Sequence, residues 1–185
     1  MTATLTTAKS SRSLTREPDG DRADYEQLLI DANVNPRTGL ATDYLNHFNE
    51  AIMLLDMIAD LPECADDFMD WCPLSYREHF QASHLQAQSF ILQAYEEAEP
   101  SHRARFDHVT SLMSSILLAV NDGMRATASD QTRIALARQA VEWVKPLLLV
   151  ADGLIHDSPI QDSLVQDSLI QDSTATIDVD RIMKK

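Results

Sequence analysis

The strongest hydrophobic pattern in the sequence runs from Asp130 to Ile155. Apolar residues recur there every three or four positions in two adjacent tracks, Ala137, Val141, Val144, Leu148, Ala151 and Ile155 in one and Leu136, Ala140, Trp143, Leu147, Val150 and Leu154 in the other. This spacing keeps each track on one side of a helix, so the segment predicts a helix with a broad apolar face that other helices must cover. Ser129 or Asp130 is the expected N-cap. Pro146 predicts a kink, because proline cannot donate a hydrogen bond to the carbonyl of Glu142.

Four further stretches show helical spacing and predict helices over residues 21–34, 42–60, 75–98 and 101–124. Their expected core residues are Tyr25, Leu28 and Leu29, then Leu45, Phe48, Ile52 and Leu55, then Phe80, Ala87, Ile91, Ala94 and Ala98, and finally Phe106, Val109, Met113, Ile116 and Val120. Thr42 is the expected N-cap of the second helix, and residues 61–73 are expected to form an acidic connection. The short connections after residues 98 and 124 favour antiparallel neighbours. The pattern therefore predicts an all-α antiparallel four-helix bundle with a short extra N-terminal helix.

Both ends of the chain lack helical periodicity. Residues 1–20 predict a disordered tail, with an organelle transit peptide as the alternative because Lys9, Arg12 and Arg16 precede the first acidic residue. Residues 156–185 predict a second disordered tail that contains most of a five-residue repeat, LIHDS-PIQDS-LVQDS-LIQDS. Ile182 and Met183 near its end could dock on a partner as a short linear motif. The expected domain therefore covers residues 21–155.

Composition agrees with a helical protein in a reducing compartment. Hydrophobic residues make up 44% of the chain and there are only four glycines. No apolar stretch approaches the roughly 18 uninterrupted residues that a membrane span needs, so no membrane association is expected. Two cysteines, Cys64 and Cys72, are too few for a disulfide framework, which favours a cytoplasmic location.

The net charge of −14 is concentrated in one part of the sequence. No lysine or arginine occurs between Arg37 and Arg77, whereas that interval contains Asp43, Glu50, Asp56, Asp60, Glu63, Asp66, Asp67 and Asp70. A surface of this charge repels phosphate backbones, which argues against binding to nucleic acid. It could serve solubility alone, or it could bind a basic partner protein.

Histidines and carboxylates in a helical bundle also raise the possibility of a di-metal or hemerythrin-like centre holding iron, zinc or manganese. The candidate ligands are Asp43, His47, Glu50, His79, His84, Asp107 and His108. At about 100° per residue, Asp43 and Glu50 fall opposite the apolar stripe of their helix, with His47 on its flank, so they are expected to face water or another subunit. His79 and His84 are separated by roughly 140° of rotation, which does not suit a shared interior metal.

His84 is the one histidine that occupies an expected core position, in the series from Phe80 to Ala98. The simplest prediction is a core histidine that is hydrogen bonded to a neighbouring group. A ligand or pH-sensing role is the alternative. A small apolar ligand beside Trp143, near the kink expected at Pro146, is a further hypothesis.

Several enzyme classes lack their residues here. No histidine is followed by the Lys and Gly of phosphotransfer domains, and the sequence contains neither a glycine-rich phosphate loop nor a Gly-x-Ser-x-Gly turn. Acidic neighbours disfavour the thiolate form of Cys64 and Cys72, so a nucleophilic role is not expected. The segments NPRTGLATDYLNHFNEAIMLLDM and PLSYREHF resemble stretches of uncharacterised bacterial all-helical proteins, a resemblance that covers about residues 21–125 and implies no activity or ligand.

The sequence therefore favours a non-enzymatic cytoplasmic interaction or regulatory module without a cofactor. The residues expected to bind the partner are Glu63, Asp66, Asp67, Asp70, Ile182 and Met183. The metal-binding bundle is the alternative function. Self-association is also expected if the apolar face of residues 130–155 is left partly uncovered.

Overall fold

The computed structural model describes residues 18–83 and 85–158. The predictions for His84, for the N-terminal tail up to residue 17 and for the C-terminal repeat tail from residue 159, with Ile182 and Met183, lie outside the described residues. Regular structure in the described part is helical, apart from one isolated bridge between Val34 and Ala41. The helices are α1 (Pro18–Asp31), the 3-10 turn η1 (Thr42–Tyr44), α2 (Leu45–Met57), α3 (Cys64–Asp70), α4 (Tyr76–Ala82), α5 (Gln88–Glu97), α6 (Pro100–Arg125) and α7 (Asp130–His156). The all-α prediction is confirmed.

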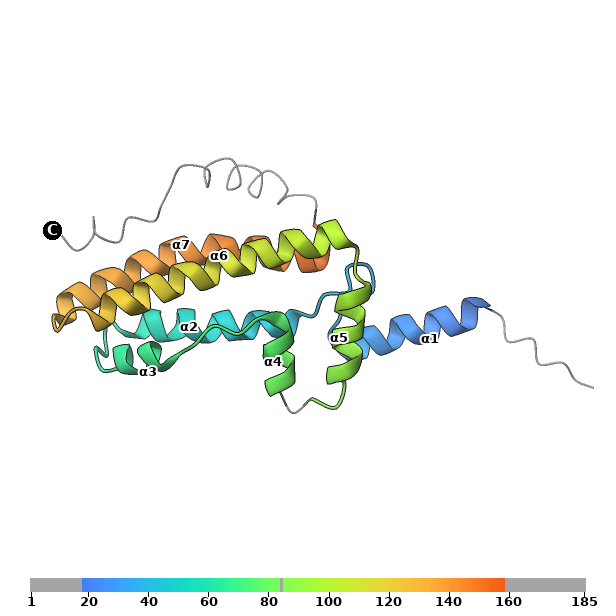
Figure 1. Ribbon diagram of the computed structural model, residues 1–185, viewed down its shortest axis with the longest axis horizontal. Coiled ribbons are helices and arrows are strands. Elements are labelled where there is room, and N and C mark those ends of the chain that lie inside the picture. The colour runs from blue at the N-terminus through green and yellow to red at the C-terminus, as the bar shows by residue number, and fades with distance from the viewer. Residues whose placement is uncertain (1–17, 84, 159–185) are drawn as a thin grey trace, which may run out of the picture.

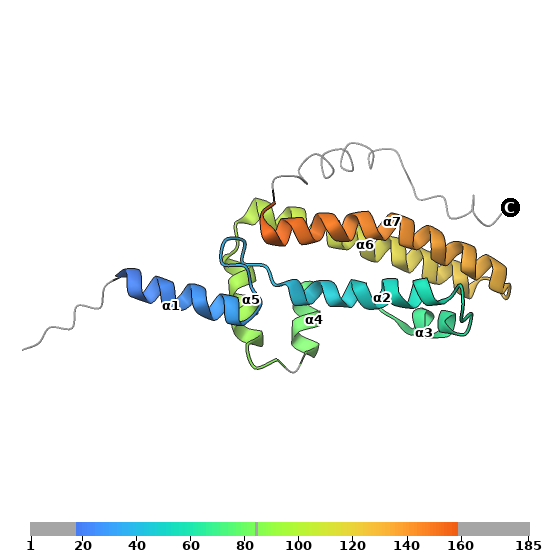
Figure 2. The same cartoon turned by 180° about the vertical axis from the view of Figure 1, so that it is seen from behind.

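The two longest helices, α6 and α7, lie side by side and form the spine of the molecule (Figures 1 and 2). The predicted core positions of α6 are all buried, and the two apolar tracks of α7 are buried or partly buried. The Ser129 side chain accepts a hydrogen bond from the Thr132 N–H, so the predicted N-cap is confirmed. Helix α7 continues through Pro146, whose side chain is exposed.

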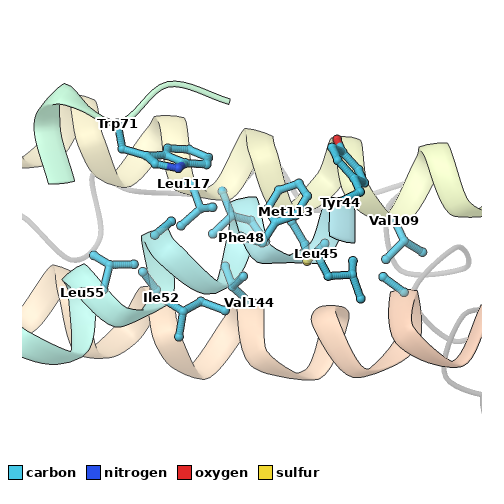
Figure 3. Packing of buried hydrophobic residues seen from close by; sticks show 14 of the residues in the cluster. Tyr44, Leu45, Phe48, Ile52, Leu55, Trp71, Val109, Met113, Leu117 and Val144 are labelled. Carbon is cyan, nitrogen blue, oxygen red and sulfur yellow. The ribbon is translucent and has the colours of Figure 1, made fainter. Parts of the chain in front are cut away.

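Helix α2 packs against α7 and closes the core beside α6 (Figures 1 and 3). Its predicted core residues Leu45, Phe48, Ile52 and Leu55 are all buried. Thr42 is the first residue of the 3-10 turn η1, and the N-cap position of α2 is Tyr44, whose side chain makes no capping hydrogen bond, so the prediction of Thr42 as N-cap is wrong. The chain instead enters α2 through the buried Tyr44, which takes part in the same core.

The segment expected to be an acidic connection contains helix α3, so that prediction is wrong. Cys64, Ala65 and Phe68 lie at helical spacing and are buried against α2 and α6, while the acidic residues between them face outward. Asn121 of α6 secures the end of α3 by donating to the carbonyls of Phe68 and Met69 at 3.2 and 3.0 Å. Arg125 donates to the Asn121 side chain at 2.8 Å and also to the Met69 carbonyl. Nonlocal packing and capping thus hold a helix of only seven residues.

The predicted helix over residues 75–98 is two helices, α4 and α5, because the chain is extended at Ser83. Helix α4 begins with a capping box between Ser75 and Glu78, and it packs on η1. No glycine or proline marks the break. Different partners hold the two halves, since α4 covers η1 whereas α5 lies against the loop around Gly39.

The loop over residues 35–41 packs against α5 and is hydrogen bonded to the end of α7. Gly39 has a φ of +70°, and a Cβ atom there would lie 2.6 Å from the carbonyl oxygen of Ala94, so only glycine fits. The Thr38 hydroxyl donates to the Ile155 carbonyl at 2.8 Å, and Arg37 pairs with Asp157. The last turn of α7 is therefore held by residues more than a hundred positions earlier in the sequence.

Helix α1 extends away from the spine and contacts the rest of the chain through a narrow face (Figures 1 and 2). Leu29 is buried and Tyr25 makes an edge contact with Phe90 of α5. The prediction of Leu28 as a core residue is wrong, since it is 57% exposed, because α5 covers only one side of this helix. Pro18 to Gly20, expected in the tail, belong to α1. Within the described ranges, no helix is long and apolar enough to cross a membrane.

Candidate functional site

His47 lies in the core beside η1, although it was expected on the flank of its helix. It is only 8% exposed, and its ring stacks on Trp71 with centroids 4.7 Å apart. The Leu74 N–H donates to His47 Nε2 at 2.9 Å. The Trp71 indole N–H donates to the His47 carbonyl at 3.3 Å. The imidazole thus holds the segment between α3 and α4 against α2.

The hydrogen bond from Leu74 requires a neutral His47 ring, because only an unprotonated Nε2 can accept. Burial, and to a smaller extent the nearby His79 ring, lower the pKa of His47 from 6.5 to about 4, although a hydrogen bond to the Cys72 backbone opposes the shift. His47 is therefore neutral at physiological pH and carries its proton on Nδ1. Its contacts explain a structural role in the core.

His79 and Asp43 lie next to His47 but also have their own structural partners. The His79 ring packs 5.5 Å from Tyr44 and 5.8 Å from His47, centroid to centroid. Burial lowers the pKa of His79, although the Asp43 carboxylate and backbone partly offset the shift. Asp43 is half-buried rather than facing water as expected, and it accepts a hydrogen bond of 3.4 Å from Asn33. These residues are brought together by aromatic packing.

The remaining metal candidates are dispersed. Glu50 and His108 are exposed, which agrees with the expectation for Glu50. Asp107 lies on α6, in the wall of a cavity described below. Across residues 18–83 and 85–158, no three or more His, Cys, Asp or Glu side chains are grouped so that they could hold a metal ion. The described residues therefore do not fit the di-metal arrangement, which needs several inward-facing ligands at one point.

The four acidic residues expected to bind a partner are all exposed. Glu63, Asp66, Asp67 and Asp70 lie on α3 or immediately before it, and we refer to them as the acidic face. Asp66 and Asp67 occupy the first turn of α3, where carboxylates also stabilise the positive end of the helix dipole. Part of this acidity thus has a local structural use.

Exposed apolar side chains precede the acidic face on α2. Met53, Met57 and Leu61, which we call the methionine row, are spaced four residues apart and are 55%, 38% and 45% exposed. Four-residue spacing places Met53 and Met57 on one side of α2, and Leu61 follows in the turn after this helix, where its N–H donates to the Met57 carbonyl. Glu50, Asp56 and Asp60 are exposed around the row. The methionine row is therefore flanked by carboxylates, and the acidic face on α3 follows it directly in the sequence.

A partly open cavity of about 450 Å³ adjoins the His47 cluster, since Leu74 both lines it and bonds to His47; residues of η1, the 73–75 loop, α4, α5 and α6 form its wall. Tyr44, Tyr76 and Tyr95 contribute to its wall, and its charged lining residues are Arg77 and Asp107. Tyr76 and Tyr95 stack with centroids 4.3 Å apart. The sequence also suggests a small apolar ligand beside Trp143 and Pro146, but neither residue lines this cavity.

Hydrogen bonds fix the polar groups of this cavity. The Tyr95 hydroxyl donates to Asp107 Oδ1 at 2.5 Å, and the Tyr44 hydroxyl donates to the Leu74 carbonyl at 2.8 Å. Burial raises the pKa of Tyr95, and the hydrogen bond to Asp107 raises it further, so the phenol remains the donor. Burial likewise raises the pKa of Tyr44 to about 12. Asp107 is thus an oriented carboxylate in a wall that combines three tyrosines with serine and threonine side chains.

No spacing pattern in the sequence predicts this cavity. It is assembled from residues spread over five segments, so spacing along any one helix could not reveal it. The available signal was weaker: Tyr44 and Tyr76 each stand four positions before a core phenylalanine, which places them on buried faces. Comparisons with protein-family models, with curated proteins and with solved structures found no match to this chain.

Proposed function

We propose that this protein is a non-enzymatic interaction module that binds a basic amphipathic segment of a partner protein through the acidic face and the methionine row. The observation that supports the proposal most directly is the exposure of Met53, Met57 and Leu61 in one row between carboxylates. Exposed methionines in register on a helix are costly in water and suit an adaptable binding surface.

The expected partner follows from the chemistry of this surface. An amphipathic helix can place its apolar residues, spaced three or four apart, on the methionine row. Lysines or arginines on its flanks would then meet Asp60, Glu63 and Asp67. Charge complementarity of this kind speeds association and selects against acidic partners. Lys145 already pairs with Asp56 at 2.9 Å, which supports the view that a cation is accepted beside the row.

Three further features belong to the same proposal. We place the module in the cytoplasm, where the free thiols of Cys64 and Cys72 would remain reduced. We also propose that α2, α6 and α7 are three of the helices of an antiparallel four-helix bundle that presents this surface. A contribution from Ile182 and Met183 stays a prediction. Self-association through α7 has less support, because both of its apolar tracks are covered within the chain.

The proposal is tested with a defined probe, a fluorescent amphipathic helical peptide of leucine and lysine, compared with its leucine and glutamate counterpart. Binding is measured by fluorescence anisotropy. We expect the affinity for the lysine peptide to fall as the salt concentration rises. The glutamate peptide should bind at least about tenfold more weakly. Equal binding of both peptides would show that the carboxylates have no part in recognition.

Matched variants locate the binding surface. Met53→Gln with Met57→Gln, and separately Asp66→Asn with Asp67→Asn, should each weaken binding of the lysine peptide. Asp122→Asn with Glu142→Gln removes as much charge from exposed positions on α6 and α7 and should leave binding unchanged. If the control pair weakens binding as much as the Asp66 and Asp67 pair, the attraction is to net charge alone.

A further inference from the structure

The cavity bordered by Tyr44, Tyr76 and Tyr95 has features of a small-molecule site that are independent of the proposed interaction surface. Its volume of about 450 Å³ falls in the range of ligand pockets, roughly 300–1,000 Å³. Its wall combines apolar surface from three tyrosines, Pro73 and Leu74 with polar side chains, and hydrogen bonds hold Tyr44, Tyr95 and Asp107 in place. Pockets that bind small molecules commonly combine an apolar lining with a few oriented polar groups.

The charged groups of the lining determine what class of molecule fits. Arg77 and Asp107 carry opposite charges and belong to the same cavity. A simple cation would be attracted by Asp107 and repelled by Arg77. A simple anion would be attracted by Arg77 and repelled by Asp107. A ligand that carries both charges can satisfy both groups at once.

Both charged groups retain capacity for a ligand. Tyr95 donates to one oxygen of Asp107, and a carboxylate can accept on both of its oxygens. Arg77 pairs with Glu96 through one terminal nitrogen, and a guanidinium has five N–H donors in a planar fork. The pair with Glu96 also orients the Arg77 side chain, which is otherwise half-exposed. Tyrosine rings beside Asp107 add a weak attraction for an ammonium group.

We propose that this cavity binds a small zwitterion of the amino-acid class, with its ammonium group on Asp107 and its carboxylate on Arg77. The rings of Tyr44, Tyr76 and Tyr95 would contact the side chain of the ligand. Such a site would make the protein a sensor or carrier of a free amino acid, in addition to any binding of a partner protein.

The first experiment screens the full chain against the twenty standard L-amino acids by saturation-transfer NMR, followed by calorimetry on those that bind. We expect at least one to bind with a dissociation constant on the order of 1 mM or below. For that ligand, the amine lacking the carboxylate and the acid lacking the amine should each bind at least about tenfold more weakly. For valine, the matched pair would be isobutylamine and 3-methylbutanoate. Absence of binding across the panel, or equal binding of the analogues, would overturn the proposal.

Variants then place the ligand. Asp107→Asn keeps an oxygen that can accept from Tyr95, and Arg77→Gln keeps a polar side chain, so both should fold, as checked by circular dichroism. Each should weaken binding at least about tenfold. Asp122→Asn on α6 and Arg138→Gln on α7 are exposed controls that should have no effect. Binding that survives both cavity variants would place the ligand elsewhere and refute the assignment. Because the comparison of analogues uses the unaltered protein, it remains decisive even if a variant fails to fold.

Discussion

Protonation of His47 should destabilise this protein in mildly acidic solution. The folded state uses the neutral ring, since Nε2 accepts the Leu74 N–H and the ring stacks on Trp71 in the core. Burial lowers its folded-state pKa from 6.5 to about 4. The unfolded chain therefore binds the proton more tightly, so stability is complete above about pH 6.5 and falls as the pH drops toward 4.

The size of the effect follows from that shift. For a single group with these two pKa values, the free energy of unfolding at pH 5 is lower by about 2 kcal/mol than at pH 7.5. The pKa of the neighbouring His79 is also lowered, so its protonation acts in the same direction. A loss of this size is a large fraction of the stability of a typical domain, about 5–15 kcal/mol.

The assay is urea unfolding followed by tryptophan fluorescence at several pH values from 7.5 to 5. His47→Gln should flatten the pH dependence by about 2 kcal/mol, because the glutamine amide oxygen can accept from Leu74 without titrating. His108→Gln removes an exposed histidine and should leave the dependence unchanged. Other titrating groups are common to all three proteins, so they cancel in the comparison. Parallel curves for wild type and His47→Gln would refute the assignment of a buried neutral imidazole.

Three further substitutions test the packing. Gly39→Ala should lower the free energy of unfolding in urea by about 2–4 kcal/mol, because the new Cβ overlaps the Ala94 carbonyl at a left-handed backbone position. Asn33 also has a left-handed backbone, and the control Asn33→Gly should cost under about 1 kcal/mol. Asn121→Ala should cost about 1–3 kcal/mol and speed amide exchange in α3, because the Phe68 and Met69 carbonyls each lose one donor; unchanged exchange there would contradict the capping role. Met113→Ala, at a fully buried site, should lower the unfolding free energy by about 2–5 kcal/mol. Leu118→Ala on the same helix is the exposed control and should cost far less, so similar losses would argue against the observed burial pattern.

Some features of the candidate sites follow from the local sequence pattern, whereas others depend on contacts between distant segments. The exposure of Glu63, Asp66, Asp67 and Asp70 agrees with the sequence expectation, because acidic residues between apolar positions of a helix face water. The burial of His47 was not foreseen, since its ring is covered by Trp71 from a different segment. The pairing of Tyr95 with Asp107 likewise joins two helices, and no spacing within either one predicts it.

The sequence by itself determined the helical class, the long helices α6 and α7 and the buried side of α2. Apolar residues repeated every three or four positions over many turns leave one stable solution, a helix with that side covered. The spacing of Cys64, Ala65 and Phe68 marks the buried side of α3, but nonlocal packing and capping hold this short helix. Only the tertiary structure decided the break at Ser83, the cavity and the environments of His47 and Asp107. Periodicity specifies which side of a helix is buried, whereas the partner that buries it, and the side chains that meet there, depend on contacts between residues far apart in the chain.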